Sequence, residues 1–419
     1  MSSGGYATDL SSPPHPGTQA VRLQALLAVA NGALFAAYAG VNAILVPTRI
    51  AAMDPHHKVT DVAVVAGLSA VCAMVANPVG GALSDRTVSR FGKRRPWLVG
   101  GACGALAGMG LLAIAGSLPM LVLAQCLTQA MLNVFQAALT AIVPDRIPVS
   151  RRGTVSAVIG VAVAVGTAGG TAGAAVLEPS RLAFGLLGLA VLVAALLMAR
   201  LPEPPSGEVT AQPGEDTANS GGLVRWLSML RHGDLAWVFA GRAAMILSYN
   251  LVFVYLLYIV ADYVRKPAGL SAARGVAVLT VISVVTSIVA IITGGVLSDR
   301  LRRYRVFVFA AGLLGGTAMV LPAVSPSWHV ILACAAIEGL AIGAYLAVDT
   351  ALVTLVLPNA RTAARDLGVV NIANAGPPVL APFIASTIVL GAGYRAVFIG
   401  SAAIALLASV TIWRVRGVR

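Results

Sequence analysis

Charged residues are scarce in this sequence: Asp, Glu, Lys and Arg make up 11% of its 419 residues, against about 25% in soluble domains. Aromatic residues are also few, at 6%, whereas hydrophobic residues reach 58% and the mean hydropathy is +0.87. A soluble fold cannot bury such a share of apolar side chains, so the composition excludes a compact soluble enzyme. A transmembrane helix needs roughly 20 apolar residues, and this length allows about a dozen of them.

Residues suited to metal binding or redox chemistry are few and scattered. The 4 cysteines all lie inside apolar runs, without paired spacing, and we interpret them as small core residues. The 5 histidines lie outside apolar runs or at their edges. A membrane-embedded enzyme would need catalytic acids, histidines or metal ligands at membrane depth. We therefore expect no enzymatic activity, no metal and no cofactor.

Apolar runs of membrane-spanning length recur along the whole chain and predict an all-α membrane protein. There are twelve of them, at residues 23–47, 62–84, 97–116, 118–143, 154–177, 182–200, 236–261, 275–298, 306–323, 328–357, 367–390 and 394–413.

Basic residues give the chain a net charge of +13 and a pI near 10.3, which without regard to position is also typical of nucleic-acid binding. Their positions favour a membrane, because 22 of the 29 fall in alternate loops on one side of the predicted segments. The positive-inside rule assigns that side to the cytoplasm. We expect a multi-pass protein of the cell membrane with both termini cytoplasmic, monomeric, with no nucleic-acid partner.

An internal repeat divides the chain into two halves. GGALSDR at Gly80–Arg86 returns as GGVLSDR at Gly294–Arg300, and Pro144 corresponds to Pro358, with an offset of 214 residues in both cases. The long polar connection rich in Pro, Gly and Glu follows the sixth segment. We expect a tail at 1–21, a six-helix bundle at 22–200, a cytoplasmic linker at 201–234, a second six-helix bundle at 235–413, and a tail at 414–419.

The loop after the second segment reads GGALSDRTVSRFGKRRPW, from Gly80 to Trp97. With the doubled six-helix repeat, this loop resembles the major facilitator superfamily over nearly the whole helical length. Its expanded spacer and RFGKRRP are similar to the glycoside and sucrose-type branch. The resemblance implies a twelve-helix transporter with a solute site between two pseudo-symmetric bundles, and it favours sugar-like solutes and proton symport.

The resemblance also implies a conformational switch in this loop. Asp85 would contact the start of the eleventh helix and hold the cytoplasmic side shut, Gly81 would permit close helix contact, and Asp145 would pair with Arg86 or its neighbours. The alternative is that these basic residues only set topology. The switch residues are Gly81, Asp85, Arg86, Gly92, Arg94, Arg95 and Asp145, with Gly295, Asp299 and Arg300 in the second copy.

Two acidic residues lie within the tenth segment, where a carboxylate costs about 2.5 to 3.5 kcal/mol on insertion scales. Glu338 lies near the midplane, and Asp349 lies toward the cytoplasmic side. With Tyr345 they follow an i, i+7, i+11 spacing, which predicts one helical face lining the cavity. Glu338 and Asp349 are the candidates for proton coupling; the alternative is a hydrogen bond to a neighbouring helix.

Amide side chains form a stripe along the fourth segment at spacings of four, four and three. Amides offer both donors and acceptors, which suits a hydroxyl-bearing solute; the alternative is hydrogen bonding between helices. By resemblance, segments one, four, seven and ten line the cavity. The candidate cavity residues are Asn31, Tyr38, Asn42, Gln125, Gln129, Asn133, Gln136, Tyr249, Asn250, Phe253, Tyr345, Asn371 and Asn374.

Two functions remain after these exclusions. The first is proton-coupled transport of a small, sugar-like solute, with that solute, protons and the lipid bilayer as partners. The second is proton-driven efflux of drugs or secondary metabolites. Export families carry a Gly-Pro motif in the fifth helix, whereas this segment reads GVAVAVGTAGGTAG without proline, which favours the first function.

Overall fold

A computed structural model describes residues 16–178, 180–201, 233–301, 304–356 and 363–414, and these residues form helices joined by short connections. The predicted all-α membrane fold is confirmed. The helices are α1 (Pro16–Gly40), a π-helical segment (Val41–Leu45), α2 (Val46–Met53), α3 (Lys58–Arg86), α4 (Arg95–Ile114), α5 (Leu118–Arg146), α6 (Val149–Leu177), α7 (Leu182–Ala199), α9 (Gly233–Phe253), α10 (Leu256–Tyr258), a second π-helical segment (Ile259–Tyr263), α11 (Ala272–Leu301), α12 (Tyr304–Val324), α13 (Trp328–Val356), α14 (Ala363–Thr411) and a 3-10 turn (Ile412–Arg414).

Eleven helices within the described ranges are long and apolar enough to cross a membrane. The last of them, α14, has 49 residues and would extend about 73 Å as one helix, more than twice the roughly 30 Å of a bilayer core. Gly393 interrupts it with φ 77° and ψ 177°, a conformation that glycine adopts readily. The break divides α14 into two crossings, which gives the predicted twelve.

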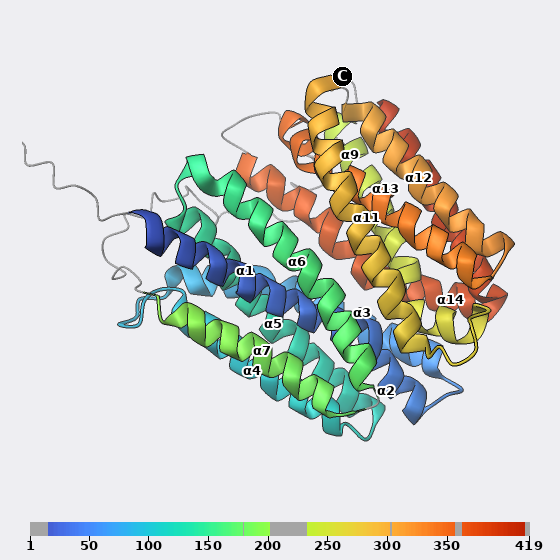
Figure 1. Cartoon of the computed structure of the whole chain (residues 1–419), viewed down its shortest axis with the longest axis horizontal. Helices are drawn as coiled ribbons and strands as arrows, with labels where there is room; N and C mark the ends of the chain where they lie inside the picture. Colours follow the sequence, from blue (N-terminus) through green and yellow to red (C-terminus); the bar gives the residue numbers. More distant parts are fainter. Residues whose placement is uncertain (1–15, 179, 202–232, 302–303, 357–362, 415–419) are drawn as a thin grey trace, which may run out of the picture.

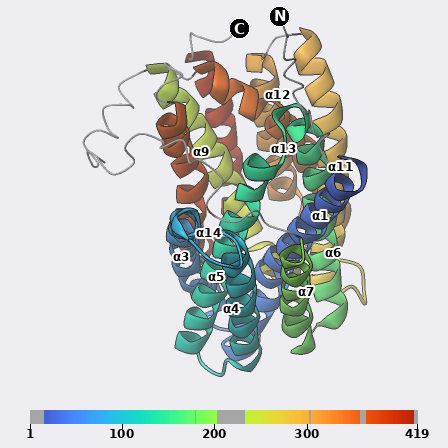
Figure 2. The same cartoon turned by 90° about the vertical axis from the view of Figure 1, so that its left-hand side faces the viewer.

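The helices pack as two bundles (Figures 1 and 2). In the first, α1 packs on α6 and α7, α5 packs on α3 and α4, and α4 packs on α7. In the second, α9 and α12 pack on α14, and α13 packs on α11 and α12. The bundles meet where α3 contacts α14 and where α6 contacts α11. We call them the N-terminal half and the C-terminal half.

Glycines bring helix backbones into direct contact inside each half. In the N-terminal half, a Cβ atom at Gly166 or Gly170 of α6 would overlap the backbone of α1. In the C-terminal half, a Cβ atom at Gly339 or Gly343 of α13 would overlap the backbone of α11. Both pairs have the Gly-x-x-x-Gly spacing that lets helices approach closely in membranes. Each half is therefore a tightly packed unit.

The first membrane-spanning helix of each half is irregular at matching depth. A π-helical segment, Val41–Leu45, separates α1 from α2, and a turn at 254–255 separates α9 from α10. With the 214-residue offset, Val41–Leu45 corresponds to residues 255–259. Such irregular turns are frequent at functional sites because they redirect side chains and free backbone groups.

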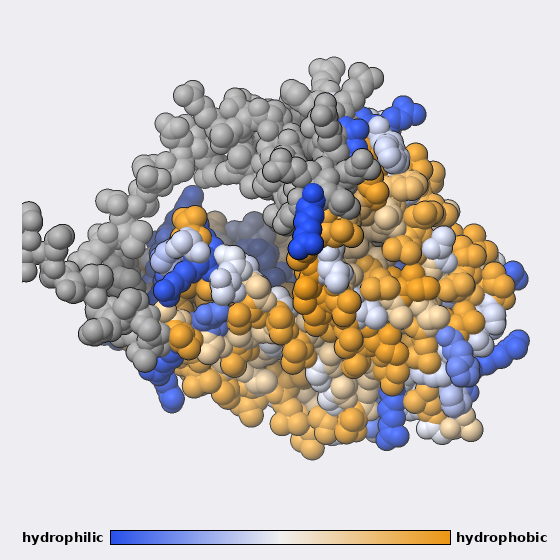
Figure 3. All heavy atoms as spheres, turned by 45° about the horizontal axis from the view of Figure 1, so that its top comes forward, coloured by the Kyte–Doolittle hydropathy of each residue, from blue (hydrophilic) through white to orange (hydrophobic). Residues whose placement is uncertain are grey.

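The two ends of the molecule differ in their connections. We call the end with the 87–94 loop the basic end and the end with the 54–57 and 264–271 loops the opposite end. At the opposite end, Tyr255 donates across the halves to the Val59 carbonyl, and Tyr258 donates to the Pro47 carbonyl. The halves diverge toward the basic end (Figure 1), where Figure 3 shows a hollow with hydrophilic residues at its rim.

Apolar side chains cover the outside of both bundles. Leu123, Val176 and Leu407 are each about 70% exposed, at 72%, 73% and 69%, and Figure 3 shows a broad hydrophobic surface below the basic end. A continuous apolar surface of this kind requires lipid around it. The composition that excluded a soluble fold is thus accounted for by the outer surface.

Candidate functional site

The amide stripe on α5 meets the π-helical segment of the first membrane-spanning helix. Gln125 and Gln129 lie one helical turn apart and both donate to one acceptor, Oδ1 of Asn42, at 2.7 and 3.2 Å. Each glutamine is left with a buried Oε1 atom that has no hydrogen-bond partner among the described residues. The arrangement therefore presents two unsatisfied acceptors.

The other end of the stripe is fully engaged. Asn133 accepts from Asn77 of α3 at 3.3 Å and donates to the backbone of its own helix. Gln136 accepts from the Tyr38 hydroxyl at 3.1 Å. The candidate Asn31 on α1 is buried and donates to the Leu27 carbonyl one turn away. Asn133, Gln136 and Tyr38 thus link neighbouring helices, whereas Asn31 bonds within α1, and the stripe divides into two parts with different surroundings.

A cavity of about 130 Å³ lies beside Gln125 and Gln129, and we call it the amide cavity. Residues of both halves line it, so it lies between them. Its walls are otherwise mainly apolar, which leaves the amides as its main polar feature. The lining residues are Asn42, Val46, Pro47, Ile50, Val62, Val65, Ala66, Ser69, Ala70, Gln125, Gln129, Asn250, Phe253, Val254 and Pro378.

A second cavity, of about 140 Å³, contains Glu338, and we call it the carboxyl cavity. Glu338 lies ten residues into α13, about 15 Å along the helix, and its buried Oε2 has no partner among the described residues. The carboxyl group faces α12 at Gly315. Phe253 lines both cavities. The other lining residues are Thr167, Tyr249, Val252, Leu256, Leu279, Thr280, Ser283, Val284, Met319, Ile331, Cys334, Ala335 and Phe398.

A comparison of the two repeats shows where the halves differ around Gln125 and Gln129. Gln125 and Gln129 correspond to Gly339 and Gly343, and Ser69 corresponds to Ser283. In the C-terminal half, the two glycines let α13 pack directly on the Ser283 and Ser287 backbone. In the N-terminal half, the glutamines and Ser69 line the amide cavity instead. The polar pair is thus particular to one half and is not a packing requirement of the repeat.

The remaining cavity candidates have varied positions. Tyr249 stacks on Phe253 with ring centroids 5.3 Å apart, and Asn250 donates to the Ile246 carbonyl. Tyr345 packs in a separate apolar cluster with Val238 and Val308 near the basic end, away from both cavities. This cluster joins α13 to α9 and α12 within the C-terminal half. Asn374 accepts from Arg242 at 2.7 Å; the side chains of Asp349 and Asn371 lie outside the described residues.

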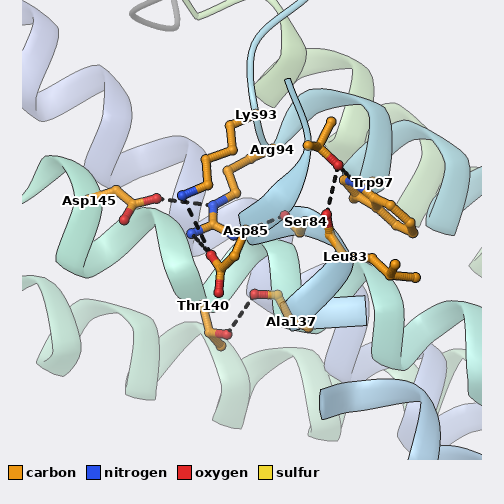
Figure 4. A network of polar contacts seen from close by, with 10 residues as sticks. Leu83, Ser84, Asp85, Lys93, Arg94, Trp97, Ala137, Thr140 and Asp145 are labelled. Atoms are coloured by element: carbon orange, nitrogen blue, oxygen red, sulfur yellow. Dashed lines mark hydrogen bonds and ion pairs between the residues drawn. The ribbon is translucent and has the colours of Figure 1, made fainter. Parts of the chain in front are cut away.

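Arg94 is the centre of the predicted switch region (Figure 4). Its guanidinium contacts Asp85 at 2.6 Å, Asp145 at 3.0 Å and the Ser84 hydroxyl at 2.9 Å. Lys93 lies 3.6 Å from Asp85. Asp145 was predicted to pair with Arg86 or a neighbour, and its partner is Arg94. Asp85, expected at the start of the eleventh helix, is paired within its own half in this conformation.

The glycines and remaining basic residues of this loop require one correction. A Cβ atom at Gly81 would only touch Ala137 at 3.9 Å, whereas at Gly80 it would crowd Val134 at 3.1 Å. Gly80, not Gly81, makes the close contact with α5, because the helix turns that residue toward it. Gly92 has φ 94°, which allows the loop to turn.

The other switch candidates have separate positions. Arg95 donates to the Leu201 carbonyl and so ties the loop to the end of α7. Arg86 is exposed. In the second copy, Arg300 is exposed, a Cβ atom at Gly295 would meet open space, and the Asp299 side chain lies outside the described residues.

Sequence reasoning missed two features. Ser69 and Ser283 repeat at the 214-residue offset and line one cavity each, so a systematic comparison of the halves would have found them. Lys58 forms an ion pair with Asp262 at 2.7 Å across the halves. No sequence pattern indicates that pair, since its members are 204 residues apart, one at the start of α3 and one in the second π-helical segment.

Two matched helix bundles, with cavities between them that carry a few buried polar groups, define a multi-pass membrane transporter. The chain belongs to the Major Facilitator Superfamily, whose family model matches residues 27–294 and 270–419. The predicted family and the absence of an enzymatic role are thereby confirmed. No curated protein matches the sequence significantly.

Solved structures with the same fold include three transporters. A nucleoside transporter, NupG, superposes with a TM-score of 0.74 at 12% identity, covering 95% of this chain and 100% of its own. A peptide transporter, POT, in complex with sulfate, gives 0.71 at 15% identity with 94% of each chain covered. A bacterial homologue of the human lysosomal transporter Spinster, inward-facing and unoccupied, gives 0.66 at 14% identity, covering 96% and 99%. At these identities the likeness establishes the fold.

Proposed function

We propose that this transporter moves a small hydroxyl-bearing solute, sugar-like in its chemistry, by proton-coupled alternating access. The observation that supports this proposal most directly is the pair of unpartnered oxygens of Gln125 and Gln129 at the amide cavity. Buried polar groups are nearly always hydrogen-bonded, so such a pair favours a polar ligand that completes it. The similar fold named as a nucleoside transporter carries a solute whose ribose also has hydroxyl groups.

Glu338 is the proposed proton-coupling residue. Its Oε2 is buried without a partner in the described part of the chain, and a lone carboxylate at membrane depth is costly unless it is protonated or paired. Protonation neutralises it, and opening toward one side of the membrane would let it release the proton. Asp349 is the second candidate from its position in the sequence.

The basic end, with Arg86, Arg94 and Arg95, is proposed to face the cytoplasm of the cell membrane, in accord with the positive-inside rule. The conformation described above would then be open to the inside. Asp85 would leave Arg94 and Lys93 and contact the start of the eleventh helix when the basic end closes. Its 59% exposed side chain is free to make that exchange.

Efflux of a lipophilic cation is the second candidate, because the carboxyl cavity has the walls that such a ligand needs. Aromatic rings of Tyr249, Phe253 and Phe398 surround it with Glu338 at one side. Aromatic faces and a carboxylate together bind organic cations. A cation would then compete with the proton at Glu338.

A proton-flux assay with the purified protein in proteoliposomes distinguishes these two functions. Internal pH is followed while sugars, nucleosides and tetraphenylphosphonium are added in turn. Proton movement with the hydroxylated solutes is expected, and movement with tetraphenylphosphonium alone would contradict the substrate proposal. Glu338→Gln should abolish proton-driven accumulation and leave counterflow exchange intact.

The matched control for that variant is Glu178→Gln, because Glu178 accepts from Thr48 at the opposite end and lies in neither cavity. It should keep both activities. Proton-driven accumulation that survives Glu338→Gln would remove Glu338 from the coupling role while leaving the substrate assignment open to the solute panel.

A further inference from the structure

The amide cavity contains hydrogen-bond acceptors that have no donor. Gln125 and Gln129 both direct their amide nitrogens to Oδ1 of Asn42, which leaves both Oε1 atoms unpaired among the described residues. Gln125 is only 2% exposed. A carbonyl oxygen in that position keeps its full desolvation penalty until a donor reaches it.

Two other polar side chains on the cavity wall already donate within their own helices. The Ser69 hydroxyl donates to the Ala66 carbonyl at 3.1 Å, and the Asn250 amide donates to the Ile246 carbonyl at 2.8 Å. The rest of the wall is made of valine, isoleucine, alanine, proline and phenylalanine side chains. No described residue donates to the two glutamine oxygens, so a molecule with hydrogen-bond donors that enters the cavity can pair with them.

The C-terminal half keeps the same helix arrangement without amides at the matching positions. The counterparts of the two glutamines, Gly339 and Gly343, let α13 rest on α11. In the N-terminal half, two large polar residues take the place of the glycines, line the amide cavity and carry two unsatisfied oxygens. The two unpaired oxygens cost stability, and a ligand that donates to them would remove that cost.

We propose that Gln125 and Gln129 form a paired acceptor site that recognises two hydroxyl hydrogens on one sugar or ribose ring. The proposal rests on the proposed transport of a hydroxylated solute and names the groups by which the solute is selected. Because both amides converge on the same Asn42 atom, the two acceptors open into one cavity and suit two hydroxyl groups held on a single rigid ring. Stacking of such a ring on Phe253, which also lines the cavity, would complete its binding from the other half.

Competition for uptake into proteoliposomes tests the proposal with two probe series. Uridine and methyl glucoside are compared with their single deoxy and deoxyfluoro analogues, since fluorine is close in size to a hydroxyl group and cannot donate. For whichever parent compound is transported, loss of either of two ring hydroxyls should weaken binding roughly tenfold, because one buried oxygen is again unpaired. The deoxyfluoro analogues should lose as much as the deoxy analogues.

Variants assign that loss to the two glutamines. In Gln125→Leu, the penalty for one of the two hydroxyls should fall from about tenfold to about onefold, and in Gln129→Leu the penalty for the other should disappear. Thr128→Val is the matched control: Thr128 is fully buried on the same helix, donates to the Ala124 carbonyl and faces α4. It should keep both penalties.

The outcomes separate this proposal from the broader one. Transport of either parent with deoxyfluoro analogues that bind as tightly as the parent would overturn the paired acceptor site and leave hydroxylated-solute transport standing. If the loss of binding caused by removing each hydroxyl is unchanged in both Gln125→Leu and Gln129→Leu, the paired acceptor site is likewise overturned and hydroxylated-solute transport still stands. Failure of every hydroxylated probe, with transport of tetraphenylphosphonium, would overturn both. The analogue series on the unaltered protein gives an answer even where a leucine variant does not fold.

Discussion

The opposite end and the basic end use charged residues in different ways. At the opposite end, Lys58 and Asp262 form an ion pair between the halves, with side chains 22% and 35% exposed. At the basic end, Arg94 binds Asp85 and Asp145 within one half, and its side chain is 7% exposed. One charge pair joins the halves, and the other charge cluster consolidates a single half.

This difference in burial matters for the transport cycle. A partly exposed ion pair contributes about 0 to 1 kcal/mol, so the Lys58 contact can break and form again as the halves rock. Removing both acidic partners from a buried arginine costs far more, because an uncompensated charge is left behind. A weak ion pair between the halves allows them to separate. The buried Arg94 cluster holds the N-terminal half together as one rigid body. Four predictions test this distinction.

The largest effect is expected from fixing the opposite end. Cysteines placed at Lys58 and Asp262, in protein whose Cys72, Cys103, Cys126 and Cys334 are replaced, can be joined by a short bifunctional thiosulfonate reagent. Transport should stop, since the two positions must separate when the opposite end opens, and a reducing agent should restore it. Each single-cysteine variant serves as the control, and full transport by completely cross-linked protein would contradict a moving contact.

Removing the ion pair should shift the equilibrium between conformations without stopping transport. In Asp262→Asn, the population open at the opposite end should rise about fivefold, equivalent to about 1 kcal/mol. The rate at which a cysteine at Ser69, on the cavity wall, reacts with an impermeant maleimide added from that side measures the shift. Exchanging the charges with Lys58→Asp and Asp262→Lys should restore the original rate; an unchanged rate in Asp262→Asn would show that the pair has no role.

A smaller effect is expected at the basic end. Asp85→Asn leaves Arg94 paired with Asp145 and Ser84, so the midpoint of thermal unfolding should change little. Turnover should fall about threefold while solute affinity is kept, a loss of roughly 0.7 kcal/mol that is typical of one exposed charge contact. Asp145→Asn is the comparison within the same cluster. Equal turnover of Asp85→Asn and the unaltered protein would assign this loop to topology alone.

The smallest effect concerns the loop that precedes Lys58. His57 Nδ1 lies 2.8 Å from Asp54 Oδ2, and this hydrogen bond raises the pKa of His57 above its ordinary 6.5 and lowers the pKa of Asp54 below 3.8. Nearby Asp61 also raises the pKa of His57. The stabilisation that the folded protein gains from protonated His57 is fully present below pH 6.5 and is lost as the pH rises through the higher folded pKa of His57. The stabilisation that the folded protein gains from ionised Asp54 is fully present above pH 3.8 and is lost as the pH falls through the lower folded pKa of Asp54.

NMR titration of labelled histidine checks this loop. The His57 resonance should titrate above pH 6.5, and Asp54→Asn should bring its midpoint close to the ordinary value. Because both side chains are exposed, transport between pH 5 and 8 should be nearly unchanged in the variant. A His57 midpoint at or below 6.5 in the unaltered protein would show that the contact does not persist in solution.

Sequence patterns predicted some parts of the site and missed others for identifiable reasons. Glu338 stands out because a carboxylate is rare within an apolar segment, and Gln125 and Gln129 stand out because amides recur at helical spacing. The pattern could not show that these glutamines would keep free oxygens while Gln136 is engaged by Tyr38. That difference depends on which neighbouring helix lies opposite each residue.

Gly80 and Gly81 illustrate the same limit on a smaller scale. Neighbouring positions on a helix point about 100° apart, so a motif identifies the pair but not the member that contacts α5. The contact of Tyr345 with Val308 on α12, instead of the central cavity, has the same origin, because a helical face is defined by spacing and its partner is not.

The sequence by itself determined the membrane residence, the number of crossings and the division into two repeats, because these depend on hydropathy, length and local motifs. Only the tertiary structure decided the pairing of Lys58 with Asp262, the burial of Arg94 and the open acceptors beside Asn42. The physical reason is that these contacts join residues far apart in the chain, and their energies depend on which groups packing leaves without water.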